Sequence, residues 1–143
     1  MKIGETYNTK VVHYEPKKSN LWVLKIMGDD GLNEQLVSSF ERPKFKKTKW
    51  WNFWKKYEIS LMKIRLRDTV TNSTIKEVYK TLTEGSNFDI QLSLLDPTGV
   101  VLEIWEINKC EIVEVDFGKL DYRDDGLIEY ELSIKPNSAK LVL

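Results

Sequence analysis

Cysteine and histidine are almost missing from this sequence of 143 residues, which contains one of each, Cys110 and His13. A disulfide within the chain is therefore impossible. A zinc site takes about four Cys, His or carboxylate ligands, and no such cluster occurs. Cys–His catalysis would need the two side chains to meet and a third group to orient the base. Because Cys110 lies in an apolar stretch and His13 in a polar leader, we expect a buried thiol and a surface histidine.

Long apolar runs and the short motifs of common enzymes are also missing. No run approaches the ~20 apolar residues that span a bilayer, and the start of the chain lacks the apolar core of a secretory signal. There is no P-loop, dinucleotide-binding fingerprint, nucleophile elbow or HExxH motif. The carboxylate pairs Asp124–Asp125 and Glu129/Glu131 are better explained as a turn and a wet strand face than as catalytic or calcium sites. We therefore predict no enzyme activity, no cofactor, no metal and no membrane anchor.

The composition is that of one soluble globular domain. Hydrophobic residues make up 41% and charged residues 31% of the chain, which are ordinary values. A chain of this length can bury one hydrophobic core but not two. We expect a single domain over residues 1–143, in which residues 1–17 form a polar N-terminal arm and residues 18–143 form the β core.

Alternation of apolar and polar residues predicts about seven β-strands, mostly antiparallel neighbours. The cleanest alternations run from Phe88 to Leu94 and from Ile128 to Ile134. Between Tyr57 and Arg67 the alternation slips by one residue, which predicts a β-bulge in one long strand. Asn108-Lys109 is predicted to be a short turn, and Leu141 to Leu143 an apolar tail.

Helical spacing of Ile75, Val78, Tyr79 and Leu82 predicts one helix at about 73–84. Thr74 to Glu77 fits a capping box, with Asn72 and Ser73 as other candidate caps. Gly85 can end the helix in the left-handed conformation. A single apolar stripe predicts that the helix packs on the sheet. The fold class is therefore mainly β, a β-sandwich or barrel of about seven antiparallel strands with one flanking α-helix.

Charge is distributed unevenly along the chain although its formal sum is zero. Residues 1–70 carry 15 Lys and Arg against 8 Asp and Glu, and residues 71–143 carry 7 against 14. If the two halves occupy different surfaces, the basic face of one copy can meet the acidic face of the next in a head-to-tail contact, which makes rings or filaments. If the halves interleave in space, the asymmetry cancels locally.

A basic and aromatic segment is the sharpest local feature. From 42 to 67 there are ten basic residues and one acidic residue, Glu58. One interpretation is a contact between copies, since Trp and Arg dominate such contacts. A second is binding of single-stranded nucleic acid by phosphate neutralisation and base stacking. A third is a solvated hairpin whose tryptophans fold back on the core. The candidate residues for the contact are Arg42, Trp50, Trp51, Phe53 and Trp54.

Acidic residues crowd the later strands, with ten between 103 and 131 against Lys109, Lys119 and Arg123. Such a wall around a pore would let a polyanion slide without sticking.

The order of four segments resembles the tail tube subunit of contractile-tailed bacteriophages. It extends over roughly residues 18–143, and the order carries more weight than any one motif. The Trp-rich insertion at 50–54 and the N-terminal arm depart from the family pattern. The segments are Leu36 to Phe45, with a proline after a serine-rich approach; Tyr57 to Ser73, a strand ending in Asp68 before the helix; Leu94 to Ile107, a hairpin with Trp105 near its end; and Val113 to Ile134, with Asp116-Phe117-Gly118 and Leu120-Asp121-Tyr122 before the last strand.

The resemblance implies a β-sandwich with a helix beside it, in which six copies form a ring and the strands join into one inner barrel. It implies that rings stack into a hollow tube of the virion tail, assembled in the host cytoplasm. The partners implied are copies of the chain itself, tail sheath, baseplate and tail terminator proteins, and the DNA that passes through during ejection. On this basis Trp50, Trp51 and Trp54 are expected at a contact between subunits, and Glu129 and Glu131 are expected to face the lumen.

Two alternatives remain open from the residues alone. The first is a baseplate tube-initiator or the tube subunit of a bacterial contractile injection or secretion system. The second is a small β-barrel that binds single-stranded nucleic acid.

Overall fold

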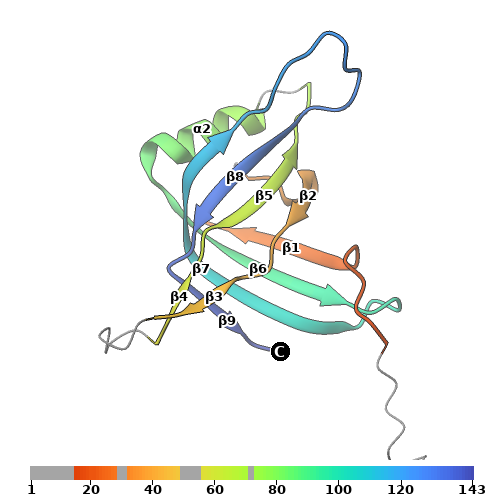
Figure 1. Cartoon of the computed structure of the whole chain (residues 1–143), viewed down its shortest axis with the longest axis vertical. Helices are drawn as coiled ribbons and strands as arrows, with labels where there is room; N and C mark the ends of the chain where they lie inside the picture. Colours follow the sequence, from red (N-terminus) through yellow and green to blue (C-terminus); the bar gives the residue numbers. More distant parts are fainter. Residues whose placement is uncertain (1–14, 29–31, 49–55, 71–72) are drawn as a thin grey trace, which may run out of the picture.

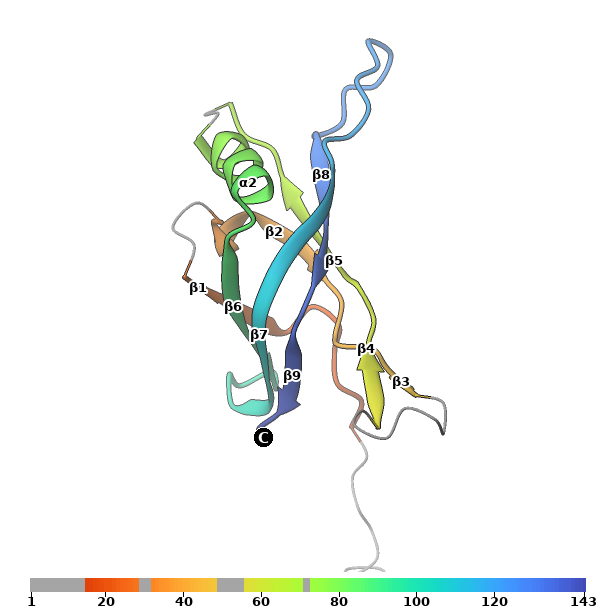
Figure 2. The same ribbon diagram turned by 90° about the vertical axis from the view of Figure 1, so that its left-hand side faces the viewer.

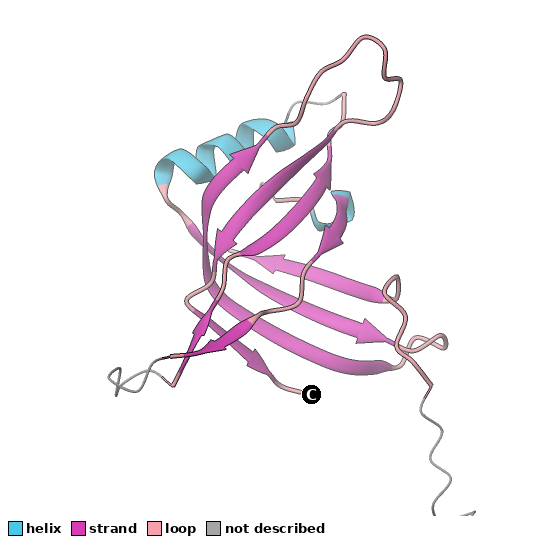
Figure 3. Ribbon diagram, viewed as in Figure 1, coloured by secondary structure: helices cyan, strands magenta, loops and turns pink. Residues whose placement is uncertain are grey.

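The computed structural model describes residues 15–28, 32–48, 56–70 and 73–143. Within these residues the chain is mainly β with one α-helix (Figure 3). The elements in chain order are β1 (Trp22–Met27), the 3-10 helix η1 (Glu34–Leu36), β2 (Val37–Phe40), β3 (Phe45–Lys47), β4 (Tyr57–Ile59), β5 (Met62–Arg67), α2 (Ser73–Glu84), β6 (Asn87–Leu95), β7 (Val101–Asp116), β8 (Glu129–Lys135) and β9 (Ser138–Leu141).

Seven strands form one sheet in the order β1-β6-β7-β8-β5-β2, with β9 also paired to β7, while β3 and β4 form a separate hairpin. The pairings between the described strands are all antiparallel. The long strand β7 belongs to two halves of the sheet, because β6 and β9 pair with its first part and β8 with its last part. The strand curves, so that the half with β1, β6 and β9 and the half with β8, β5 and β2 run in different directions (Figures 1 and 2).

One hydrophobic core joins the two halves. Alternate residues of β5 are buried and the residues between them are exposed, as expected for a strand with one face on the core. In β6 the buried residues Phe88, Ile90 and Leu92 alternate with half-buried ones. The core residues that are almost completely buried include Met62, Ile64, Leu66, Val78, Phe88, Ile90, Leu92, Ile107, Cys110, Tyr130, Leu132 and Ile134. The predicted fold class is confirmed.

The helix α2 lies against β7 with Val78 fully buried, and Ile75 and Leu82 pack on the core. Two details of the prediction are wrong. Tyr79 is more than half exposed and does not belong to the buried stripe. The helix already begins at Ser73, so Thr74 lies inside its first turn and not at the N-cap; Asn72 lies outside the described residues. Gly85 has φ +69°, the predicted left-handed end.

The strand predicted from Tyr57 to Arg67 is interrupted and not bulged. β4 ends at Ile59 and β5 begins at Met62. β4 pairs with β3 in the separate hairpin, whereas β5 pairs with β8 and β2. The Ser60 amide donates to the Lys44 carbonyl at 2.9 Å, which holds the start of the interruption to the hairpin. The slip in the apolar pattern therefore marks a change of sheet.

The turn predicted at Asn108-Lys109 is also wrong, because β7 continues through it. Lys109 has φ +49°, and its amide donates to the Asp89 side chain at 2.8 Å. The β6–β7 register shifts between Phe88 and Ile90. A residue in the left-handed conformation beside a register shift is a bulge, which bends a strand without ending it.

The C-terminal residues form a strand and not a loose tail. β9 pairs with β7 from Trp105 to Asn108, next to the part of β7 that pairs with β8. The pairing extends to the last residues, since the Val142 amide donates to the Ile104 carbonyl and the Ile104 amide to the Leu143 carbonyl. β8 ends just before Pro136, and the chain then pairs with β7 again as β9.

Candidate assembly surfaces

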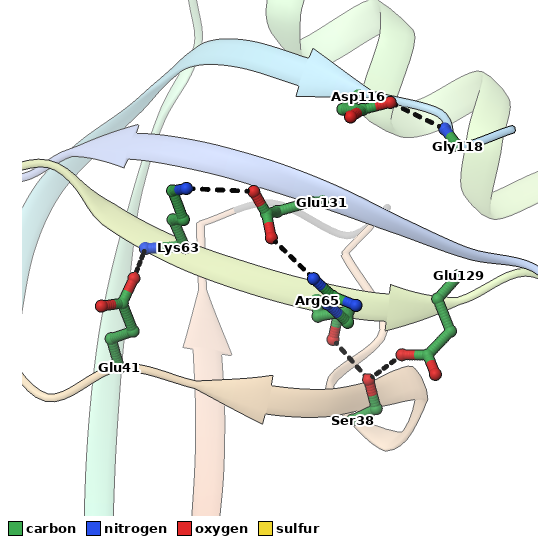
Figure 4. A network of polar contacts seen from close by, with 8 residues as sticks. All are labelled: Ser38, Glu41, Lys63, Arg65, Asp116, Gly118, Glu129 and Glu131. Atoms are coloured by element: carbon green, nitrogen blue, oxygen red, sulfur yellow. Dashed lines mark hydrogen bonds and ion pairs between the residues drawn. The ribbon is translucent and has the colours of Figure 1, made fainter.

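The outer face of β5 and β8 carries charges of both signs that pair within the chain (Figure 4). Glu131 lies between two cations: it is 3.5 Å from the Lys63 ammonium and 3.1 Å from the Arg65 guanidinium. Glu129 accepts a hydrogen bond from the Ser38 hydroxyl at 2.5 Å. We call these residues the charged face. Its bases come from β5 and its acids from β8, so the two oppositely charged parts of the sequence interleave here.

The sequence suggested an acidic wall along the later strands, but on this face the acidic residues are paired with basic ones. The strand pairings set Arg65 opposite Glu131 and Arg67 opposite Glu129, so the acids of β8 are matched by neighbouring bases. Ion pairs on an exposed face contribute little to stability, typically about 0–1 kcal/mol each. A surface of alternating charge presents weak net attraction or repulsion to a polyanion. That Glu129 and Glu131 face a lumen remains a prediction.

A second charged cluster surrounds a buried carboxylate, Glu103 on the inner face of β7. Glu103 is 5% exposed. Its carboxylate accepts hydrogen bonds from the Lys17 ammonium at 2.5 Å, from Arg42 at 3.2 Å and from the Trp105 indole. The cluster thus joins β7 to the segment before β1 and to the connection between β2 and β3.

Burial opposes the charge of Glu103, but the hydrogen bonds from Lys17, Trp105 and Arg42 outweigh it and lower the pKa of the carboxyl from 4.5 to about 2. A carboxylate held in this way stays ionised in the folded protein at any ordinary pH. The predicted contact residue Arg42 therefore has a partner inside its own subunit, although its side chain remains more than half exposed.

The segment predicted as a contact is a hairpin that projects from the main sheet. Phe45 of β3 lies edge-on to Tyr57 of β4, with ring centroids 5.4 Å apart, and tilts against Trp105 with centroids 5.8 Å apart. Lys44, Lys46, Lys47 and Lys56 are exposed. We call residues 44–48 and 56–59 the basic hairpin. Trp50, Trp51, Phe53 and Trp54 lie outside the described residues, so their predicted contact remains a prediction.

The connection between β7 and β8, residues 117–128, carries exposed carboxylates at its tip and is called the acidic loop. Asp121 accepts from the Arg123 amide and side chain, and the Asp124 carboxylate accepts from the Gly126 amide at 2.9 Å. Gly118 has φ +91°, and a Cβ there would lie 2.8 Å from the Glu129 carbonyl oxygen. These local bonds give the loop a defined shape, since Asp side chains fix turns by bonding nearby amides.

The main sheet ends in the strands β1 and β2. The Leu95 amide donates a hydrogen bond to the Leu21 carbonyl. In an antiparallel pair the backbone groups of alternate residues face the partner strand, so every second residue of β1 directs its N–H and C=O toward β6, and the residues between direct theirs away. Ile26 is one that turns away, and its amide donates to the Glu34 carboxylate at 2.7 Å. A groove of about 540 Å³ separates the two edges, lined by Ser19, Asn20, Trp22, Val23, Leu24, Glu34, Gln35, Val37 and Ser38. Unpaired edges are templates for pairing with another strand.

Cys110 is fully buried, as predicted. Burial, with a smaller contribution from Asp89, raises the pKa of its thiol to about 12, so it is protonated at neutral pH and a poor nucleophile. His13 lies outside the described residues. None of the described helices is long and apolar enough to cross a membrane.

No protein-family model and no curated protein sequence matches this chain. Solved structures do. A chain of the structure described as the PVC sheath/tube terminator of an extracellular contractile injection system, in the extended state, has a TM-score of 0.69 at 9% identity and covers 92% of this chain and 100% of its own.

Two further structures extend this likeness. A chain of the anti-feeding prophage baseplate has a TM-score of 0.62 at 10% identity, covering 90% of this chain and 96% of its own. Hcp1 from Flavobacterium johnsoniae has a TM-score of 0.58 at 11% identity, covering 85% of this chain and 94% of its own. Identities this low establish a common fold and no more. The chain therefore has the fold of tube-type proteins of contractile injection systems, and the resemblance found in its sequence is confirmed at the level of the fold.

Proposed function

We propose that this chain is a structural subunit of a contractile tail or injection machine, and that copies of it form stacked sixfold rings of the inner tube. In the phage form of the proposal the rings line the path of the genome, the sheath surrounds them, and a baseplate and a terminator close the two ends. The finished tube belongs to the virion tail and is assembled in the host cytoplasm. The work is mechanical, so the protein needs no catalytic group.

The observation that carries the proposal is the open sheet within the shared fold. The core residues are buried, but β1 and β2 each have one strand neighbour among the described residues. An exposed edge is an aggregation hazard that proteins usually block or cover. Pairing the edge of one copy with the sheet of the next satisfies these backbone groups and closes the ring. In this proposal the charged face, on strands β5 and β8 next to β2, lines the lumen of the ring.

A position at one end of the tube is the second form of the proposal. It is favoured by the likeness to a chain of a sheath/tube terminator structure, of which the whole length is covered, and by that to a chain of a baseplate structure. A terminal subunit makes rings but does not extend them. Tube and terminal subunits therefore differ in whether rings stack.

The test is negative-stain microscopy of the purified full chain, with sedimentation velocity over a wide concentration range. Stacked rings or hollow rods support the tube subunit, and single rings support the terminal position. A species that stays monomeric at every concentration contradicts both forms. If that monomer captures single-stranded oligonucleotides in a salt-sensitive way, the nucleic-acid-binding alternative replaces them.

A further inference from the structure

We propose that successive copies meet end to end, with the acidic loop of one copy docked on the basic hairpin of the next. The inference rests on the proposed function and deepens it, since it names the surfaces through which rings would stack. The partner is a second copy of this chain.

The two surfaces project from opposite parts of the molecule. The acidic loop forms the upper extremity along the long axis in both views, while β3 and β4 lie in the lower part (Figures 1 and 2). A contact between two different surfaces of identical copies is heterologous. It leaves a free loop at one end and a free hairpin at the other, so it repeats indefinitely.

Their charges are complementary. The described part of the hairpin carries Lys44, Lys46, Lys47 and Lys56 against Glu58. The loop carries Asp121, Asp124 and Asp125 against Lys119 and Arg123, and the side chain of Arg123 is engaged by Asp121. Among the described residues no ion pair joins the four lysines or Asp125 to an opposite charge. The ends therefore keep the charge asymmetry that cancels on the charged face.

Apolar side chains accompany the charges on both surfaces. Leu120, Tyr122 and Leu127 of the loop are almost fully exposed. Phe45 and Tyr57 of the hairpin are about half exposed. Contacts between proteins draw most of their energy from a few such side chains, while surrounding charges steer and align the partners.

A groove of about 980 Å³ beside the hairpin could bind the acidic loop of the next copy. It lies between β4 and the corner where β8 passes into β9, and its cations are Lys56, Lys109 and Lys135, with Glu58 and Glu111 as its acids. The hairpin is held at its root by the Phe45–Trp105 ring contact, and the tip of the loop is shaped by the Asp121 and Asp124 turns. Preorganised surfaces lose less entropy on binding.

Charge-reversal variants of the full chain test the contact. The hairpin variant is Lys44→Glu with Lys47→Glu, which leaves Lys46 opposite Glu58. The loop variant is Asp124→Asn with Asp125→Lys, in which Asn keeps the oxygen that bonds the Gly126 amide. We expect each variant alone to form rings whose end-to-end association constant falls at least about tenfold. Combining both variants in one chain restores opposite charges, and we expect it to restore stacking.

The matched control for the hairpin variant is Lys76→Glu with Lys80→Glu, which changes the charge of the exposed face of α2 by the same amount as that variant; stacking should not change. Circular dichroism checks that each variant folds. Normal stacking in both end variants, or failure of the combined variant to recover, overturns the contact while the rings still support the proposed function. Wild-type protein without any rings contradicts the proposed function as well. Loss of oligonucleotide binding in the hairpin variant with unchanged stacking assigns the hairpin to nucleic acid.

Discussion

Opposite charges are paired with each other on the charged face, but they are kept apart at the two ends of the molecule. On the face, Lys63 and Arg65 from the basic part of the sequence bind Glu131 from the acidic part. At the ends, the lysines of the basic hairpin and the aspartates of the acidic loop lie on separate projections. An asymmetry along the sequence can thus cancel in one region of a fold and persist in another. Where it persists, the opposite charge can come from another copy.

The ends also differ from the face in how they are held. The root of the acidic loop contains Gly118, which no other residue can replace without strain. The root of the basic hairpin is held by the buried carboxylate of Glu103, which bonds Arg42 and Trp105. The face depends on exposed ion pairs. Substitutions at these three places should therefore have graded effects on the free energy of unfolding.

The largest effect is expected at the root of the acidic loop. Gly118→Ala would place a Cβ 2.8 Å from the Glu129 carbonyl oxygen at φ +91°, which should lower the free energy of unfolding by about 3 kcal/mol. Gly99 has the same φ of +91° with open space around it, so Gly99→Ala should cost about 1 kcal/mol. Urea unfolding of both variants measures the difference. Equal losses would show that the close approach at Gly118 has no effect.

The next effect is expected at the root of the hairpin. Glu103→Gln removes the charge shared by Lys17 and Arg42 and leaves the Trp105 indole with a weaker acceptor, so we expect a loss of about 2 kcal/mol. Because the pKa of Glu103 is lowered from 4.5 to about 2, its stabilising contribution is complete above pH 4.5 and is lost as the pH falls toward 2. The stability difference between wild type and variant, from urea unfolding at several pH values, should shrink across that range. A difference that stays constant with pH would contradict the role of the charge.

The smallest effect is expected on the charged face. Glu131→Gln breaks two exposed ion pairs, and the free energy of unfolding should change by less than about 0.5 kcal/mol. The same unfolding experiment in low and high salt should give nearly the same difference. A loss as large as that of Glu103→Gln would erase the contrast between the exposed face and the buried carboxylate of Glu103.

Local patterns predicted the parts of the fold that depend on neighbours in sequence. The alternation from Phe88 to Leu94 marked the core face of β6, and Gly85 marked the end of α2. The local sequence could not predict the interruption at Ser60, because it arises from the different pairing partners of the strands on its two sides, β3 for β4 and β8 for β5. β9 was missed because four residues carry too short a pattern, and its pairing with β7 is a tertiary contact.

The site was predicted less completely than the fold. In the sequence Glu103 was counted only as one of the acidic residues of the later strands, because its partners Lys17 and Arg42 lie 86 and 61 residues away in the chain. A local sequence pattern cannot predict a cluster of residues that lie so far apart in the chain. A lone glutamate at an inward position of an otherwise apolar strand was the one available signal. The charged ends, by contrast, were visible as a charge asymmetry, although the sequence could not say which charges would cancel.

Amide hydrogen exchange of assembled and monomeric protein, measured residue by residue, tests most directly whether copies complete each other's sheet edges. The Glu41 amide donates to the Lys63 carbonyl of β5. Because the backbone amides of successive strand residues point to opposite sides, the Phe40 amide of β2 points away from β5. We predict that exchange at Phe40 slows strongly on assembly, while exchange at Ile26, already bonded to Glu34, changes little. Equal exchange at the β1 and β2 edges in monomers and assemblies would contradict the account.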